Sequence, residues 1–589
     1  MQTLAGLPTA RGFAVGPVFV YRGEGDVPVP EYVVEPGLEA DELVRLKRAI
    51  VETRRDIEAI IAALRDRGGR ADVKIFECHQ MLLEDAILAG ETERHILERR
   101  LNAEAAVRRT ANRAREQFGR MNDPYFRERV RDLDDVERRL LRALTGFGGQ
   151  THLELKEPSI VVADDLTPSE TVQLPRENVL GFATNGGSTT SHVALLARAM
   201  GIPAVTGLVD ITDRVKPGET VLLDGTNGAV TLSPDAASLR SFLDLVERQR
   251  EIVEEAALGA PAGTLKDGAD VPLYANVHPG VPVADVKMQG ARGIGLYRSE
   301  YLWLNREKEP TEEEQFKAYR DAAKFVSTLG SEAWVSIRTL DIGGDKLVRG
   351  ISTVEANPFL GKRSIRYLLA NPGVFRTQLR AILRASGFGK VSVLYPMVSC
   401  VEELAACAEI LAEEKARLTA ENVAFDAEIP VGVMIEVPSA ALNAGAFAKY
   451  VDFFSIGTND LVQYTMAADR GNESVAHLYQ PTNPAVLKLM RMTVDAAKRN
   501  GLKVGVCGES AADPIVGVLW AAMGVDILSM SATYIPVMAK LFSRLTRADL
   551  ADYAATVEGL GDAVSAAQVL ERCRAWMRAK IPDLDNIVL

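Results

Sequence analysis

The sequence has few cysteines and no excess of positive charge. Only five of its 589 residues are cysteines and none forms a CxxC pair, which excludes a disulfide framework and argues against a zinc site of paired cysteines. The formal net charge is -12 at pH 7. Because phosphate backbones attract basic surfaces, this charge argues against nucleic acid as a partner.

The chain also lacks the patterns that take a protein into or across a membrane. It has no uninterrupted run of about 18 apolar residues, the length that a transmembrane helix needs. Its start, MQTLAGLPTARGFAVGPVFVY, has neither the basic first part nor the continuous apolar stretch of a signal peptide. We therefore expect a cytoplasmic protein with no membrane partner.

The chain contains enough apolar residues to form several hydrophobic cores. Hydrophobic residues make up 47% of it and charged residues 25%, as in ordinary soluble globular proteins. With 589 residues it exceeds the size of one compact domain, and we expect about three to four units.

A helical region is predicted after Pro36. Leu43, Ile50 and Ile57 recur every seven residues, which places them on one face of a long helix. Further helical patterns follow, so residues 37–145 predict a subdomain of helical hairpins. The expected role of this subdomain is to dock a partner.

An α/β unit is predicted on both sides of this helical region. Residues 12–21 have the pattern of a strand, and short apolar runs typical of strands start again at Ser159. The turn DGTNG at 224–228 predicts a β-hairpin. We assign residues 1–36 and 146–236 to one α/β domain.

A linker is predicted after this domain. A charged helical pattern at 239–258 runs into the sequence GAPAG at 259–263, where glycine and proline indicate a flexible connection. We assign residues 237–263 to a linker helix and hinge.

Residues 264–589 contain eight short apolar runs typical of strands, each followed by a helical pattern. The runs are VPLYANV, GIGLY, AWVSIRTL, SVLYPMV, VGVMIEVP, DFFSIG, KVGVCGE and DILSMSA. Eight βα units in one segment predict a (β/α)8 TIM barrel. The expected fold class is therefore multidomain α/β, with an N-terminal α/β domain, an inserted helical subdomain and a C-terminal TIM barrel.

Polar residues follow the predicted strands at the end of a barrel where active sites form. They are Arg298, Arg338, Glu436, Asn459, Asp460 and Cys507, and two further cations, Lys346 and Arg470, lie in the segments beyond two of these strands. Guanidinium groups match carboxylate and phosphate oxygens. A single arginine is more often a solvated surface residue, but several at one barrel mouth predict a site for a ligand that carries both groups.

The acidic residues and the cysteine at these ends each have two interpretations. Glu436 and Asp460 could share a hard cation, which for phosphate chemistry is usually Mg²⁺, or they could be ordinary acids in local salt bridges. Cys507 could be a small buried hydrophobe, the commoner role of a free cysteine. It could also be an acid, since an ordinary cysteine pKa of about 8.5 keeps the thiol protonated at neutral pH.

His192 lies in GGSTTSHVALLARAMGIP, where a loop of small residues leads into a predicted helix. The N–H groups and dipole at a helix start favour negative charge, so phosphate on the imidazole would be stabilised there. Taken alone, such a histidine is more often structural. Thr167 follows a strand of the same unit and could bond one ring nitrogen, leaving the other to attack.

Motifs along nearly the whole chain resemble Enzyme I of the bacterial phosphoenolpyruvate:sugar phosphotransferase system, the family of phosphoenolpyruvate-protein phosphotransferases. The motifs, in the order and spacing of that family, are HQMLLED, DDLTPSETVQL, TSH with LARAMGIPAVTG, GIGLYRSEYLW, IRTLDIGGDK, NPFLGKRSIR, VMIEVPSA, SIGTNDLVQYTMAADR and GVCGES.

The resemblance implies that phosphoenolpyruvate phosphorylates His192, which Thr167 orients, and that Cys507 protonates the enolate to give pyruvate. It implies that the phosphoryl group then passes to the phosphocarrier protein HPr, docked on the helical subdomain, as the first step of sugar uptake. The implied substrate-binding residues are Arg298, Arg338, Lys346, Asn459 and Arg470, and the implied Mg²⁺ ligands are Glu436 and Asp460. The family forms homodimers through its barrels, and its histidine domain swings between barrel and carrier.

One departure leaves the branch of the family open. Sugar-branch members typically read GGRTSH, whereas Thr189 stands here in place of the arginine, so a charge that could stabilise phosphate is absent. The nitrogen-related form of Enzyme I is the second candidate, although it usually carries an N-terminal sensory domain. A dikinase or phosphoenolpyruvate synthase would need a nucleotide-binding domain, for which residues 1–145 have no glycine loop. A non-catalytic docking protein would not need His192, Cys507 and both carboxylates.

Overall fold

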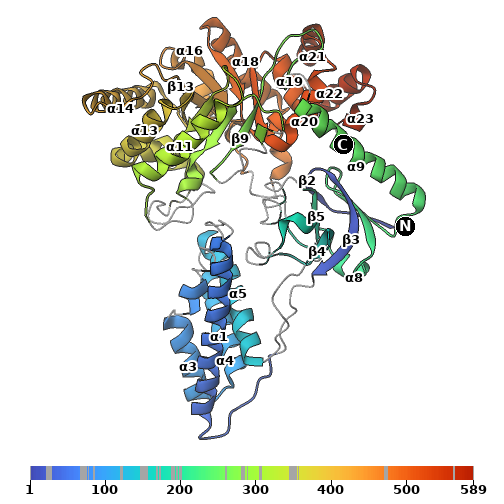
Figure 1. The fold of residues 1–589 in the computed structure, drawn as a ribbon, viewed down its shortest axis with the longest axis vertical. Coiled ribbons are helices and arrows are strands. Elements are labelled where there is room, and N and C mark those ends of the chain that lie inside the picture. The colour runs from blue at the N-terminus through green and yellow to red at the C-terminus, as the bar shows by residue number, and fades with distance from the viewer. Residues whose placement is uncertain are drawn as a thin grey trace. The chain divides into compact units, whose positions relative to one another are not determined.

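The computed structural model divides the chain into two compact units, Met1–Glu247 and Arg248–Leu589 (Figure 1). The structure describes residues 2–21, 29–66, 76, 79–83, 86–119, 124–145, 155, 157–166, 170, 174–187, 193, 197, 202–258, 262–279, 286–287, 289–303, 308–343, 355, 357–469, 475–561 and 564–587.

Four long helices of the first unit form a bundle (Figure 1). They are α1 (Glu39–Asp66), α3 (Ala86–Arg99), α4 (Ala103–Gly119) and α5 (Pro124–Thr145). The apolar stripe predicted on the first helix faces the core of this bundle, where Ile57 is fully buried and Leu43 and Ile50 are partly buried. Burial of that stripe, rather than intrinsic helix propensity, holds the helices together.

The first unit also contains an eight-stranded sheet with the order β1-β8-β7-β3-β4-β5-β6-β2. Its strands are β1 (Gln2–Ala5), β2 (Leu7–Ala10), β3 (Phe13–Tyr21), β4 (Ser159–Ala163), β5 (Val179–Thr184), β6 (Ala204–Thr206), β7 (Thr220–Asp224) and β8 (Ala229–Leu232), with a short helix α8 (Ile211–Arg214). The predicted hairpin is confirmed, since β7 and β8 pair antiparallel around the DGTNG turn.

The sequence did not predict β1 and β2, which lie at opposite ends of the strand order. β1 pairs with β8, and β2 pairs with β6. Only Gly6 separates the two strands, and a Cβ at Gly6 would lie 2.6 Å from the carbonyl oxygen of Thr206. The two edge strands of the sheet are therefore connected by a single residue, and only glycine fits there without contact between a Cβ and the backbone of Thr206.

The predicted linker helix is present as α9 (Ala236–Leu258). The division between the two compact units falls inside this helix, between Glu247 and Arg248. Residues 259–261 of the predicted hinge lie outside the described residues.

The second unit contains the predicted (β/α)8 barrel, a closed ring of eight parallel strands in the order β10-β11-β12-β13-β14-β15-β16-β9. The strands are β9 (Leu273–Val277), β10 (Ile294–Arg298), β11 (Val335–Arg338), β12 (Val391–Tyr395), β13 (Val431–Ile435), β14 (Phe453–Ile456), β15 (Lys503–Val506) and β16 (Ile527–Ser531). Each lies within one of the eight predicted runs or within one residue of it, which confirms the multidomain α/β fold class.

Helices surround this barrel (Figure 1). They are α11 (Glu312–Val326), α12 (Ser364–Ala370), α13 (Pro372–Ser386), α14 (Val401–Ala420), α15 (Pro438–Leu442), α16 (Ala444–Phe447), α17 (Thr458–Met466), α18 (Pro484–Arg499), α19 (Val516–Ala522), α20 (Ile535–Phe542), α21 (Arg547–Glu558), α22 (Ala566–Lys580) and α23 (Leu584–Ile587). Short 3₁₀ helices of the barrel unit occur at Ser299–Leu302, Pro358–Leu360, Ala476–Leu478, Glu509–Ala512 and Ala532–Tyr534, and one of the first unit occurs at Arg176–Asn178.

Side chains along the barrel strands point alternately to the interior and the exterior of the barrel, which gives two apolar layers. A small inner cluster contains Leu394 of β12 and Met434 of β13 together with Leu296 and Cys507. The outer layer, between strands and helices, includes Tyr395. Within the described part of the chain, no helix combines the length and apolar character needed to cross a membrane.

Candidate active site

The polar residues predicted at the barrel mouth lie where the strands end. Arg298 and Arg338 are the last residues of β10 and β11, and they are paired in register. Glu436 directly follows β13, and Cys507 directly follows β15. Asn459 and Asp460 lie in the first turn of α17, after β14. His192, Thr167, Lys346 and Arg470 lie outside the described residues.

Arg338 is buried and held by two carboxylates. Its Nη2 donates to Glu300 Oε1 at 2.6 Å, and its Nη1 lies 2.9 Å from Asp341 Oδ2. Burial would lower the pKa of Arg338, but the charges of Asp341 and Glu300 outweigh burial and raise it. The guanidinium group is therefore permanently charged and fixed in orientation at the end of β11.

A second buried arginine, Arg363, joins two acids across the mouth. Its Nη2 donates to Asp341 Oδ1 at 3.2 Å and its Nη1 donates to Asp460 Oδ1 at 3.0 Å. The same Nη1 lies 3.0 Å from the hydroxyl of Tyr464. Burial acts to lower the pKa of Arg363, and Asp341 and Asp460 together raise it well above its ordinary value.

The sequence interpretation gave no role to Glu300, Asp341 or Arg363. Asp341 lies three residues beyond Arg338 in IRTLDIGGDK, and Arg363 lies in NPFLGKRSIR. Because these residues lie in motifs of the family, the sequence could have identified them as candidates. Their pairing could not be predicted, because Arg363 and Asp460 are 97 residues apart in the chain.

Glu436 is buried beside the other acids. Its Oε1 accepts a hydrogen bond from the backbone N–H of Met397 at 2.6 Å. A Cβ at Gly457 would lie 2.5 Å from Glu436 Oε2, so glycine leaves room for this carboxylate. Burial, with the charges of Asp460 and Asp341, raises the pKa of Glu436 to about 8.

Asn459 connects two strand ends. Its Oδ1 accepts from the backbone N–H of Glu509 at 2.9 Å, and its backbone oxygen accepts from the Tyr479 hydroxyl at 2.9 Å. The side chain therefore ties the start of α17 to the segment that follows β15.

Cys507 is a buried thiol at the mouth. The hydroxyl of Ser455 donates to Sγ at 3.2 Å, and Sγ lies 3.7 Å from the backbone oxygen of Ile456. Burial raises the pKa of Cys507 to about 11, although the Ser455 hydrogen bond acts to lower it. The thiol therefore keeps its proton throughout the neutral range.

The acids of the mouth favour a cation. Glu300, Asp341, Glu436 and Asp460 face the guanidinium groups of Arg338 and Arg363. With Arg298 at the adjacent strand end, four acids and three arginines leave one negative charge when all are ionised. Among the residues that the structure describes, no three potential ligands are grouped so as to hold a metal. A pair of carboxylates completed by substrate oxygens is nevertheless a common way to bind Mg²⁺.

Comparison with known proteins decides the family. Three family models match: PEP-utilising enzyme, PEP-binding domain over residues 253–547; PEP-utilising enzyme, N-terminal over 5–129; and PEP-utilising enzyme, mobile domain over 155–228. The phosphoenolpyruvate-protein phosphotransferase of Geobacillus stearothermophilus is 41% identical over 577 residues, which are 97% of this chain and 98% of the relative. The chain belongs to the phosphoenolpyruvate-protein phosphotransferase family, Enzyme I.

Other members of the Enzyme I family match almost as extensively. The Bacillus subtilis member is 40% identical over 93% of this chain and 95% of its own length. The Mycoplasma capricolum member is 38% identical over 86% of this chain and 87% of its own length. The resemblance stated from the motifs is thus confirmed, and with it the enzyme class EC 2.7.3.9. The PEP-binding model spans all eight barrel strands and the mouth residues described above.

Proposed function

We propose that phosphoenolpyruvate binds at the mouth of the barrel and phosphorylates His192, which passes the phosphoryl group to a phosphocarrier of the HPr type. One observation carries the proposal: buried arginines, carboxylates and a protonated thiol gather at the carboxyl ends of the barrel strands. That combination suits a ligand with phosphate and carboxylate groups that leaves as an enolate.

Arg298 and Arg338 are the proposed anchors of the substrate. They end adjacent strands, so their guanidinium groups can bind different oxygens of one small anion. Glu300 and Asp341 hold Arg338 in a fixed orientation, which reduces the entropy lost when substrate binds. Lys346, Asn459 and Arg470 are proposed to complete the site.

Glu436 and Asp460 are the proposed ligands of Mg²⁺. Both supply hard oxygen donors. The pKa of Glu436 is raised first by burial and then by the charges of Asp460 and Asp341, and a divalent cation would offset both. When bound, Mg²⁺ would neutralise charge on the phosphate oxygens of the substrate.

The chemistry follows from the side chains. A ring nitrogen of His192, oriented by Thr167, attacks phosphorus; a P–N bond forms while the bond from phosphorus to the enolate oxygen breaks. The enolate carbon then takes the proton of the Cys507 thiol and becomes the methyl group of pyruvate. With its pKa near 11, the thiol keeps its proton until the enolate forms. Solvent restores the proton to the thiolate.

The wider role is proposed from the family. Residues 37–145 would dock the carrier, residues 1–36 with 146–236 would carry the histidine, and residues 264–589 would bind substrate and pair two chains as a homodimer. We propose sugar uptake in the cytoplasm as the pathway, with the nitrogen-related branch as the second candidate because of Thr189.

The test is phosphorylation from radiolabelled phosphoenolpyruvate in the presence of Mg²⁺. Acid-labile label should appear on the unmodified chain and on His477→Ala, a matched control at an exposed histidine, and should be absent from His192→Ala. Label on the chain should then move to an added HPr-type carrier. Equal labelling of His192→Ala and the unmodified chain would refute the mechanism.

A further inference from the structure

His278 lies at the mouth of the barrel but has no role in the mechanism proposed above. It directly follows β9, which ends at Val277. Ala275 and Val277 belong to the outer apolar layer. Asn276, between them, instead donates to the backbone oxygen of Cys507, a residue of the inner cluster. Because side chains alternate along a strand, His278 is on the same side as Asn276 and faces the interior at the mouth.

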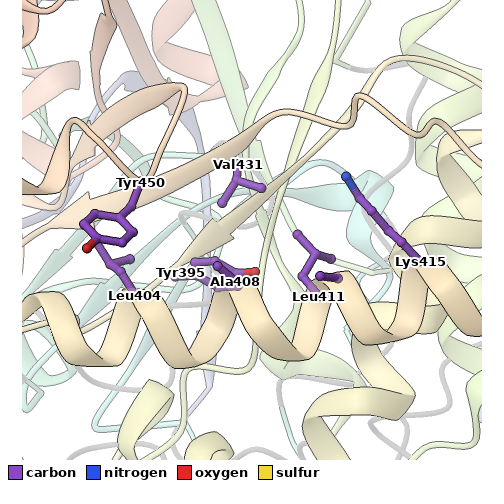
Figure 2. Close-up of a pocket in the computed structure, with 8 residues that line it drawn as sticks. Tyr395, Leu404, Ala408, Leu411, Lys415, Val431 and Tyr450 are labelled. Carbon is purple, nitrogen blue, oxygen red and sulfur yellow. The ribbon is translucent and has the colours of Figure 1, made fainter.

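The same alternation on β13 leads to a residue already located at the mouth. Val431 faces outwards, and Figure 2 shows it lining a groove together with Leu411 of α14. Met434 belongs to the inner cluster. Glu436, two residues further along and directly after the strand, is the buried carboxylate of the mouth. His278 has the corresponding position on β9.

His278 stands in a row with the two proposed anchors of the substrate. Tyr297 of β10 pairs in register with Val277 of β9, so the next residues, Arg298 and His278, are neighbours on adjacent strands. Arg298 in turn pairs with Arg338 of β11. Three adjacent strands therefore end in three nitrogen-bearing side chains at one level of the barrel.

The imidazole ring of His278 is held by two contacts. It stacks on the ring of Tyr301, with centroids 4.3 Å apart and 11° between the planes. Its Nδ1 lies 3.0 Å from the backbone oxygen of Pro279. A carbonyl oxygen only accepts hydrogen bonds, so we assign the proton of the neutral ring to Nδ1. The other nitrogen, Nε2, is then the one that can gain a proton.

One segment positions two members of this row. Glu300 binds Arg338, and the next residue, Tyr301, stacks on His278. Both belong to the short 3₁₀ helix Ser299–Leu302, which follows β10. A group that is fixed before a ligand arrives loses less entropy on binding. The contacts of His278 are therefore those expected of a binding residue rather than of a mobile surface histidine.

The surroundings of His278 disfavour its charged form until an anion binds. Among the described residues, the charged and titratable groups around it are Arg298, Glu300 and Tyr301. Burial lowers the pKa of His278 and so does Arg298, while the bond to Pro279 and the charge of Glu300 counteract them only in part. An anionic ligand at the mouth would offset the charge of Arg298 and offer Nε2 an acceptor.

We propose that His278 is a further substrate-binding residue, which takes up a proton when phosphoenolpyruvate binds and donates it from Nε2 in a hydrogen bond to an anionic oxygen of the substrate. The inference rests on the proposed function, because it needs phosphoenolpyruvate at the mouth. The proton comes from solvent and returns to solvent when the ligand leaves, and no covalent bond to carbon or phosphorus changes. His278, Arg298 and Arg338 would then surround one small anion with three donors.

Proton uptake can be measured by calorimetry on the full chain in a His192→Ala background, where phosphoenolpyruvate should bind without reacting. Titrations with saturating Mg²⁺ in two buffers of different ionisation enthalpy give the number of protons taken up with each substrate molecule. Measurement at pH 7 and pH 8 largely avoids titration of the substrate, since a phosphate monoester has its second pKa at about 6. The parent with His278 should take up as much as about one proton more than His278→Gln.

Affinity gives a second measurement on the same proteins. His278→Gln keeps an amide N–H but cannot take up a proton, and it should weaken binding about tenfold at pH 7, as for a lost hydrogen bond to a charged group. The difference should shrink at pH 8, because fewer histidines keep the proton there. His477→Gln, at an exposed histidine, should match the parent. Tyr301→Ala should weaken binding about threefold through loss of the stacked ring, whereas Tyr301→Phe keeps the ring and should have no effect.

Equal proton uptake by the parent and His278→Gln would overturn the inference, and so would equal affinity at pH 7. A loss of affinity without a change in proton uptake would also contradict it, since the histidine would then act only through its shape. His278→Asn, a smaller amide, provides the same measurement if His278→Gln does not fold.

Arg298→Met separates this inference from the proposed function. If Arg298→Met binds phosphoenolpyruvate as tightly as the parent, the substrate does not bind at the mouth and both fail. If it loses binding while His278→Gln does not, only the role of His278 fails.

Discussion

In the described part of the barrel unit, a network of arginines and carboxylates at the mouth can be compared with one on the flank. At the mouth, Arg338 and Arg363 are almost fully buried, and so are the acids that bind them. On the flank, Arg384 of α13 binds Glu312 and Glu313 of α11 at 2.7 and 2.8 Å, and Glu313 is 70% exposed.

The two networks contain the same chemical groups but differ in their exposure to water. Water can solvate the flank charges if a partner is removed, so their pairing contributes little to stability. The charged groups at the mouth are buried, so water does not solvate them when a partner is removed, and their burial has a desolvation cost. A cluster with this cost at the strand ends supports the proposed role, which is to place cations and acids around a substrate.

The largest expected effect comes from removing a mouth arginine. Arg363→Met leaves Asp341 and Asp460 without their shared cation and should lower the free energy of unfolding by about 3–5 kcal/mol. Urea unfolding followed by tryptophan fluorescence measures this, because all four tryptophans lie in the barrel unit. A loss below about 1 kcal/mol would mean that the mouth pairing behaves like the flank pairing.

A similar contrast applies to the cysteines. Cys507→Ala removes the proposed proton donor and should slow pyruvate formation from phosphoenolpyruvate by about 10²–10³-fold, a typical range for a general acid. The control is Cys573→Ala, a buried cysteine of α22 in the outer apolar layer, which should leave the rate unchanged. Equal rates for the two variants would remove Cys507 from the mechanism.

Much of this arrangement could be predicted from sequence. The eight barrel strands were recognised because strands buried on both faces are continuous apolar runs, and Arg298, Glu436 and Cys507 were placed at their ends for that reason. β1 and β2 were missed because each has only four residues, mostly exposed in β1.

The pairing within the site could not be predicted. Met397 binds Glu436 through its backbone N–H and has a positive φ of 59°. Every residue except proline has such an N–H, and a positive φ is expected of glycine or asparagine rather than methionine. The Arg363 bridge to Asp460 joins segments that only the closed barrel brings together. His192 and Thr167 remain predictions from sequence.

A smaller effect concerns pH. Without Mg²⁺, Glu436 in the folded chain keeps its proton up to about pH 8, whereas the ordinary pKa of a glutamate is 4.5. The folded state therefore binds more protons than the unfolded state between these values, and stability falls as pH rises through that window. We expect a loss of about 1–2 kcal/mol between pH 6 and 8, reduced by Mg²⁺ and absent in Glu436→Gln. Thermal melts at each pH, with and without Mg²⁺, measure it, and identical slopes for both proteins would exclude Glu436 as the cause.

The smallest effect is expected on the flank. Arg384→Met keeps a side chain over the Phe316 ring, which the guanidinium carbon approaches to 4.0 Å, but loses the bonds to Glu312 and Glu313. The free energy of unfolding should fall by about 1 kcal/mol or less. The difference from the unmodified chain should shrink further in 1 M salt, where the screening length is only about 3 Å. The loss in Arg363→Met should largely persist in the same salt, because salt screens buried ion pairs much less than exposed ones. If salt reduced both losses alike, burial would not be what separates the two networks.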